Sequence, residues 1–232
     1  GDLDSGKQFN VKVGKQQVVW GRSDLFRVLD VINPMDFSRN SIYDEFEDIR
    51  IPMWILQTIY RMGGSDSLSE RNLQVVWNFD QFRANNLGQC GTPNAVLDAG
   101  CFFRGAKSLW DYGGTVGNLA PGALFGGAPP PYNGLAGFGA AGVAGTVPTH
   151  QVGIRNVDLP DWKLKNTQIG TRFEGVSKDG TIAFSLNALA GRSQMPSLHA
   201  IRPGALAFDM VFPRTSVLGG SMDFNIESLN TT

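Results

Sequence analysis

The sequence has little charge, few histidines and cysteines, and no long apolar run. Charged residues make up 18% of its 232 residues, against roughly 25% in an ordinary soluble domain. The formal net charge is −1, so the chain lacks the basic excess of a nucleic-acid-binding protein, and we expect no nucleic-acid partner. The best apolar stretch, residues 51–60, contains Pro52 and Gln57 and is shorter than the roughly 18 residues of a membrane helix. A membrane location would therefore require a β-barrel, whose strands pair all of their backbone groups.

Glycine and phenylalanine are abundant instead, with 29 and 15 residues respectively. Glycine weakens helices and aromatic residues favour strands, so this composition disfavours a helical protein. The length suits one domain with a full core or one mid-sized barrel, and we treat residues 1–232 as a single domain. The chain opens at Gly1 without a signal peptide, as expected for a mature form or an internal fragment.

Four segments alternate apolar and polar residues with a period of two, which predicts strands with one apolar face. They lie at residues 8–14, 73–80, 168–174 and 182–187. The last two flank Asp179-Gly180, a pair that favours a tight turn, so residues 167–189 are predicted to form a β-hairpin. Further strands are expected at residues 50–61, 204–212 and 217–225, giving about seven or eight in all.

A long insertion separates these strands. Residues 113–149 are dominated by Gly, Ala and Pro and are predicted to belong to a long loop over residues 83–156, which is either functional or disordered. Residues 137–142 match the glycine pattern of a dinucleotide-binding turn. Such a site needs a strand before it and a helix after it, and the neighbouring prolines favour a chance match. We expect no cofactor.

Cys90 and Cys101 lie close together in a region rich in Gly and Asn. Zinc would need about four ligands, and the only histidines, His150 and His199, are far away in the sequence. A local disulfide in an oxidising compartment is the favoured prediction. The alternative is a pair of free thiols in a cytosolic loop, and no metal site is expected in either case.

Alternation alone fits both a soluble β-sandwich and a membrane β-barrel. The apolar face is the core of a sandwich, whereas in a barrel it faces lipid and the polar face lines water. Charged residues at mid-strand, aromatic residues near strand ends, and one short turn beside one very long connection favour the barrel. The predicted pore-lining residues are Lys12, Asp80, Arg172 and Glu174. The predicted lipid-facing residues are Val13, Trp77, Phe173 and Phe184.

A group of charged residues lies between two of the expected strands. Its members are Asp44, Glu45, Glu47 and Asp48, flanked by Arg39 and Arg50. A solvated charged surface is the simpler interpretation. The alternative is a pore constriction, in which opposed acidic and basic side chains select solutes by charge.

Two motifs resemble those of a known family. Residues 11–21, which end in Trp20-Gly21, and the later Asn33-Pro34-Met35-Asp36 resemble the "RxGrQxxxWG … NPxD" region of a proteobacterial family of outer-membrane barrels. That family is catalogued as domain of unknown function thirteen-hundred-and-two. Residues 50–54, 166–173 and 184–187 are similar to further segments of it, so the resemblance covers most of the chain except the Gly/Ala/Pro tract.

The resemblance implies an outer-membrane location in a Gram-negative bacterium, with contact to outer-membrane lipid. Family members are often encoded near resistance-nodulation-division exporters and a second periplasmic family, which implies an exporter system and a periplasmic protein as partners. Outer-membrane barrels usually finish on a strand ending in an aromatic residue, whereas this chain stops at Thr232, so we expect an incomplete barrel.

We therefore predict an all-β fold, an antiparallel transmembrane β-barrel, which acts as a porin-like channel. It would allow passive passage or export of a small or amphipathic solute and would not be an enzyme. The alternative is a soluble periplasmic β-sandwich that binds a ligand.

Overall fold

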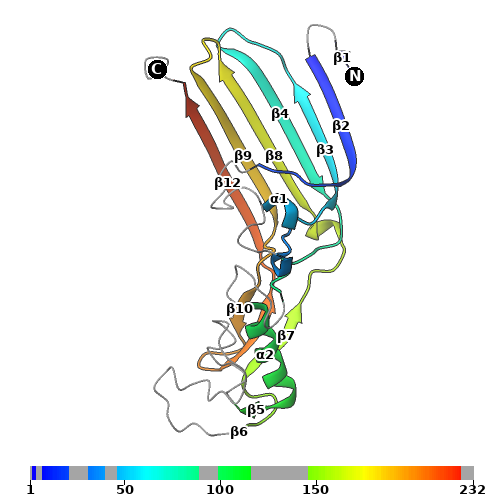
Figure 1. Ribbon diagram of the computed structural model, residues 1–232, viewed down its shortest axis with the longest axis vertical. Coiled ribbons are helices and arrows are strands. Elements are labelled where there is room, and N and C mark those ends of the chain that lie inside the picture. The colour runs from blue at the N-terminus through cyan, green and yellow to red at the C-terminus, as the bar shows by residue number, and fades with distance from the viewer. Residues whose placement is uncertain are drawn as a thin grey trace.

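One large antiparallel sheet dominates the computed structural model (Figure 1). The structure describes residues 2–3, 7–20, 31–39, 46–88, 99–115 and 146–225. The seven strands of the sheet follow the order β1-β2-β3-β4-β8-β9-β12, and every neighbouring pair is antiparallel. They are β1 (Asp2–Leu3), β2 (Lys7–Gln16), β3 (Met53–Arg61), β4 (Leu68–Asn78), β8 (Gln168–Ser177), β9 (Ile182–Arg192) and β12 (Arg214–Phe224). The prediction of an all-β class is confirmed, and so is antiparallel pairing in this sheet.

The six main strands are unusually long. β3 has 9 residues, β2 and β8 have 10, and β4, β9 and β12 have 11. Strands of globular proteins most often have about 5–6 residues, whereas a strand that crosses a membrane needs about 9–11. The alternating sequence pattern therefore continues over a length typical of membrane strands.

The connections between these strands differ sharply at the two ends of the sheet (Figure 1). Residues 62–67 join β3 to β4 and residues 178–181 join β8 to β9, both at one end. At the opposite end, the connections are residues 17–52, 79–167 and 193–213. We call these the short-turn end and the long-connection end.

The predicted hairpin over residues 167–189 is present as β8 and β9. Gly180 has a φ of 72°, which is the left-handed conformation that glycine adopts most easily. The Asp179 carboxylate accepts hydrogen bonds from the Ser177 hydroxyl and from the Thr181 backbone N–H. The Asp-Gly pair thus forms the turn that the sequence predicted.

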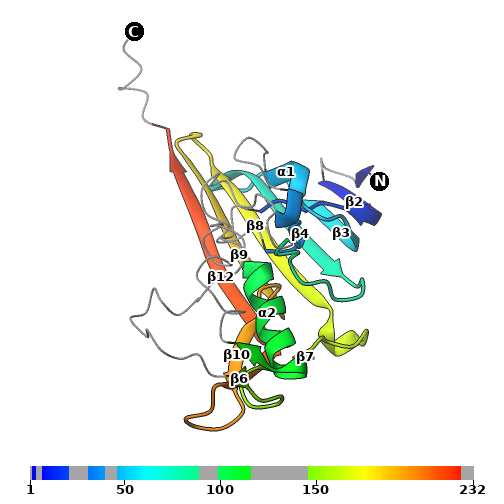
Figure 2. The same cartoon turned by 60° about the horizontal axis from the view of Figure 1, so that its bottom comes forward.

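A smaller unit lies beyond the long-connection end (Figure 2). Its sheet has the order β10-β11-β7, formed by β7 (Gly153–Asp158), β10 (Ser197–Ala200) and β11 (Ala207–Val211). Helix α2 (Ala99–Tyr112) packs against it, and Ala106, Ile154, Met210 and Phe212 form a shared core. Two short strands, β5 (Gly114–Thr115) and β6 (Thr146–Val147), pair with each other beside it.

Helix α2 corrects the prediction that residues 83–156 form a loop throughout. The helix contains Gly100 and Gly105 and several aromatic residues, and each glycine costs about 1 kcal/mol relative to alanine in a helix. Burial of Ala106 and Leu109 and the ion pair of Lys107 with Asp111 offset this low helix propensity. Residues 116–145, the centre of the Gly/Ala/Pro tract, lie outside the described residues.

Within the described residues, the large sheet is open. β12 pairs only with β9, and the opposite edge is formed by β1 and β2. Closure into a transmembrane barrel therefore stays a prediction. Among the described helices, none has the length and apolar character needed to span a membrane.

Candidate functional site

The strand pairing of the large sheet places apolar side chains on one face and polar side chains on the other. Val13 pairs with Leu56, Leu56 with Trp77, and Trp77 with Ile169, and directly paired residues share one face of a sheet. We call this side the apolar face and the opposite side the polar face. Phe173 and Phe184 also lie on the apolar face, and their rings are 6.0 Å apart.

Large side chains of the apolar face are open to solvent. Val13 is 64% exposed, Leu218 is 82% exposed and Phe224 is 64% exposed. Soluble monomers rarely leave a contiguous apolar patch larger than a few hundred square ångströms uncovered. This face therefore needs an apolar environment.

The predicted pore-lining residues fall on the other side, with one exception. Lys12 pairs with Gln57, Arg172 pairs with Asn187, and Glu174 pairs with Ser185, all on the polar face. Asp80 was predicted at mid-strand, and this is wrong, because β4 ends at Asn78. Its carboxylate instead accepts a 3.0 Å hydrogen bond from the Trp54 backbone N–H, and so it joins the ends of two strands.

Near the long-connection end, the polar face is covered by the chain that follows β2 (Figure 1). Val18, Trp20 and Ile32 pack on the sheet residues Met53, Ile55, Val76 and Leu189. Gly170 allows this approach, since a Cβ there would lie 2.6 Å from the Trp20 ring. The Trp20 indole N–H also donates to the Gln74 side chain at 3.0 Å. We call the described parts of this chain, residues 17–20 and 31–36, the inner segment.

Asn33 fixes the inner segment to the strand ends. Its side chain is fully buried. Its Oδ1 accepts from the Val18 N–H at 2.8 Å, and its Nδ2 donates to the carbonyl groups of Gln16 and Ile51 at 3.0 Å. One amide thus holds the ends of β2 and of the chain leading into β3 together.

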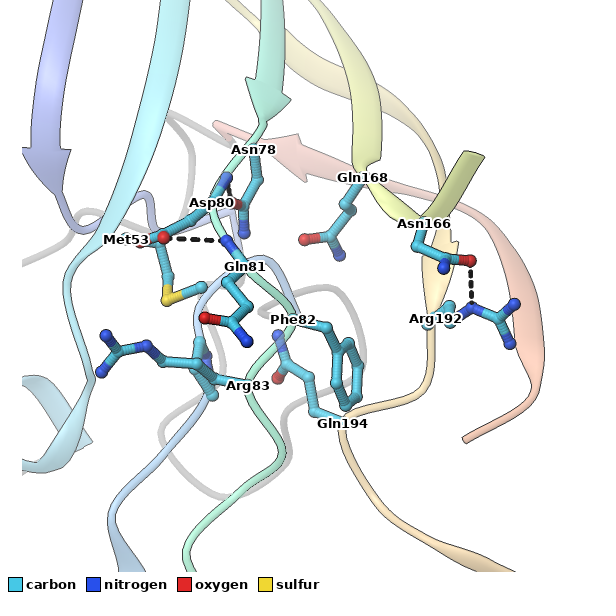
Figure 3. Close-up of a pocket in the computed structure, with 11 residues that line it drawn as sticks. Met53, Asn78, Asp80, Gln81, Phe82, Arg83, Asn166, Gln168, Arg192 and Gln194 are labelled. Atoms are coloured by element: carbon cyan, nitrogen blue, oxygen red, sulfur yellow. Dashed lines mark hydrogen bonds between the residues drawn. The ribbon is translucent and has the colours of Figure 1, made fainter. Parts of the chain in front are cut away.

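Two glutamines, one at the start of β8 and one just after β9, hold the same segment. Gln168 donates to the carbonyl of Val31 at 3.0 Å, and Gln194 donates to the carbonyls of Val31 and Ile32. Figure 3 shows both amides beside a cavity that Asn166 and Arg192 also line. The volume of this cavity is about 20 Å³. A polar space of this size holds about one water molecule, so the cavity is part of the structural network and is too small for a solute.

Farther along the polar face, two buried polar atoms lack a hydrogen-bond partner. They are Nε of Arg172 and Oδ1 of Asn187, whose residues are direct cross-strand neighbours. Arg172 forms a 2.6 Å ion pair with Glu174, and Asn187 donates to Ser185. Because both atoms are buried, an internal water is the partner that such a donor and acceptor call for. The Arg172–Glu174 ion pair beside them is partly exposed, so we take these two charged residues as the candidate solute-contact site.

The predicted charged constriction is only partly described. Glu47 and Asp48 are exposed in the short helix α1 (Phe46–Ile49), close to the 3-10 helix η1 (Phe37–Arg39), whereas Arg50 is buried with 4% exposure. Asp44, Glu45 and the Arg39 side chain lie outside the described residues. The constriction therefore stays a prediction, and Arg50 does not belong to a solvated surface.

Cys101 is disulfide-bonded and lies in the first turn of α2, where a loop was expected. Cys90 lies outside the described residues, so its pairing with Cys101 stays a prediction.

Comparison of the chain with known protein families gives the same family that the sequence motifs resemble. A family model described as "Protein of unknown function (DUF1302)" matches residues 1–232. The chain belongs to this family. Comparison with curated proteins and with solved structures found no match.

The DUF1302 motifs lie where the inner segment meets the sheet. The Trp20 ring lies over Gly170, and the Asn33 amide bridges the end of β2 and the chain that leads into β3. Sequence reasoning missed Gln168 and Gln194, because an amide that binds a distant backbone carbonyl has no local sequence signal. Asn187 could have been found, since it occupies a polar position in the alternating pattern of residues 182–187.

Proposed function

We propose that this protein forms the wall of an outer-membrane channel, with its apolar face in lipid and its polar face along a water-filled path. The exposed apolar face supports this most directly. A soluble sheet buries its apolar side in a core, whereas a membrane barrel exposes that side to lipid.

Aromatic residues bound the apolar face at both ends. Trp54 and Trp77 lie near the long-connection end, whereas Phe9, Tyr60 and Phe224 lie near the short-turn end. Between them the side chains are mostly aliphatic, such as Val11, Val13, Leu56 and Val75. Aromatic girdles around an apolar band are typical of outer-membrane barrels, because amphipathic rings favour the membrane interface.

The length of the strands matches the thickness of a membrane. An 11-residue strand such as β9 or β12 is about 37 Å long and covers about 26 Å at a tilt near 45°. The apolar band of such barrels is about 25 Å tall. Short turns at one end and long connections at the other are a second property of these barrels, whose longer loops face the cell exterior.

The alternative, a soluble β-sandwich, would need a second sheet over the apolar face. The second described sheet, β10-β11-β7, lies beyond the strand ends (Figure 1). Its core residues Ile154 and Met210 pack with α2 and Phe212, away from the apolar face. The sandwich is therefore the weaker proposal.

The proposed mechanism is permeation without covalent chemistry. Polar side chains along the path replace part of the hydration of a small or amphipathic solute. The partly exposed ion pair of Arg172 and Glu174 offers charged groups for this contact. We propose neither a catalytic residue nor a cofactor, and an exporter with a periplasmic protein remains the proposed partner system.

Substitution of Leu218 by arginine tests the proposal. Leu218 is already 82% exposed on the apolar face, so Leu218→Arg should not harm a soluble protein. At the centre of a lipid-facing band, however, arginine costs about 2–4 kcal/mol. We expect the variant to assemble poorly into detergent micelles or vesicles, as shown by loss of the heat-dependent gel shift of folded barrels.

The matched control is Thr215→Arg, on the same strand but on the polar face, which should assemble normally. A wild-type protein that stays soluble without detergent, or a Leu218→Arg variant as stable as wild type, would exclude the membrane channel.

A further inference from the structure

A row of exposed cations follows the apolar face at the long-connection end. Lys15 pairs with Trp54, so its side chain shares the apolar face. Arg214 lies on that face at the start of β12, four residues before Leu218. Lys163 and Lys165 lie between these strands, at the 3-10 helix η4 (Leu164–Asn166) that precedes β8. We call these four residues the basic row, and all four are exposed.

The turn that carries the two lysines is fixed to the aromatic end of the apolar face. The Trp162 indole N–H donates to the carbonyl of Phe79 at 3.0 Å. The Trp77 indole N–H donates to the Thr167 hydroxyl at 3.1 Å, and the Arg214 guanidinium donates to the Lys165 carbonyl. These contacts hold the lysines immediately beyond the girdle of Trp54 and Trp77.

This turn mixes apolar and basic side chains in a manner that suits an interface between lipid and water. Leu159, Trp162 and Leu164 are 63%, 69% and 74% exposed, and the last two alternate with Lys163 and Lys165. Tryptophan and lysine side chains prefer the headgroup level, where the apolar portion contacts acyl chains and the polar end contacts water.

Neighbouring carboxylates neutralise only a small part of the positive charge of the basic row. Asp161 forms an ion pair with Lys163, and Asp80 faces the Trp54 backbone. Lys15 and Lys165 have no carboxylate partner in the part of the chain that the structure describes. At the short-turn end, the turn of residues 178–181 carries Lys178 directly beside Asp179, so the two charges balance.

We infer that the basic row binds the phosphate groups of lipid headgroups in the leaflet at the long-connection end. This inference rests on the proposed membrane location and specifies the lipid that this end selects. The cations extend from β2 to β12 and are all exposed, an arrangement that fits a surface of many headgroups. A single bound ion would need converging, buried donors.

Quenching of tryptophan fluorescence by brominated lipids tests the inference with the full chain in vesicles. Trp54, Trp77 and Trp162 lie at the girdle and report which lipid is adjacent. We compare brominated phosphatidic acid, which carries an exposed phosphate, with brominated phosphatidylcholine. Each cation near an anionic surface changes the association constant about 5-fold, so wild type should prefer phosphatidic acid by at least about that factor.

The Lys163→Gln/Lys165→Gln variant should lose most of this preference while retaining quenching by phosphatidylcholine. The control variant Lys7→Gln/Lys178→Gln removes two charges at the short-turn end and should keep the preference. Equal quenching of wild type by both lipids, or full preference in Lys163→Gln/Lys165→Gln, would overturn the inference but leave the membrane location intact. Absence of quenching by either lipid would instead refute the membrane location itself.

Discussion

At the scale of single residues, the polar face contains one position where removal of a charge is expected to change selectivity. Arg172 is the cation of an ion pair with Glu174, and its Nε has no partner. Arg172→Gln leaves Glu174 as the dominant local charge. In planar bilayers, we expect the cation-to-anion permeability ratio to rise about 2- to 5-fold, as one charge at short range in a wet pore would produce.

Lys178→Gln, in the exposed turn outside the path, should leave the ratio unchanged. An unchanged reversal potential for Arg172→Gln would show that this part of the polar face does not line the path.

A second residue, Asp179, links the stability of the β8–β9 turn to pH. The hydrogen bond from the Ser177 hydroxyl, helped by Thr181, lowers the pKa of Asp179 to about 2. The unfolded chain has the ordinary value of 3.8, so the stabilising effect is complete above about pH 4 and is lost between about pH 4 and pH 2.

Asp179→Asn removes this titration. We expect the difference in unfolding midpoint between wild type and variant to shrink as the pH falls from 4 to 2, measured by denaturant titration. A difference that is constant over this range would contradict the assignment.

At the scale of elements, the sequence predicted what depends on local patterns. The hairpin of β8 and β9 follows from alternation around Asp179-Gly180. The placement of Lys12 and Val13 on opposite faces of the sheet follows from the two-residue period. Helix α2 was missed, because its stability comes from packing on β7 and not from its own composition. The inner segment was missed because Gln168 contacts a carbonyl 137 residues away in sequence.

The inner segment gives a prediction at this scale. Asn33→Ala removes the hydrogen bonds to the buried N–H of Val18 and to the partly buried carbonyls of Gln16 and Ile51. Since each unsatisfied buried group costs about 1–3 kcal/mol, we expect the free energy of unfolding to fall by about 2–4 kcal/mol after partial rehydration. Chemical denaturation followed by the fluorescence of buried Trp20 provides the measurement.

Asn10→Ala, at an exposed position of the polar face, is the control and should change stability by less than about 0.5 kcal/mol. Equal stability of Asn33→Ala and Asn10→Ala would mean that Asn33 does not hold the segment.

At the scale of the whole molecule, three properties agree although they arise from different parts of the sequence. The strands have membrane length, the turns are short at one end and long at the other, and the apolar face is exposed between aromatic ends. The sequence predicted each in part, from one turn, one insertion and scattered aromatic residues. The two-residue period alone could not decide which face is uncovered, because the same alternation serves a soluble core and a lipid contact.

The edge strand β12 allows a test of whether the sheet is paired with a further strand in the membrane. β12 pairs only with β9, so half of its backbone N–H groups point away from the described sheet. In the hydrocarbon region each such group would be unsatisfied at a cost of several kcal/mol, so a membrane barrel has to pair them with another strand. We therefore expect amide hydrogen exchange of residues 216–222, measured with the protein in micelles, to be as slow as that of β9, which pairs on both sides. Fast exchange confined to the outward N–H groups of β12, with β9 still protected, would show that the sheet stays open and that this edge faces water.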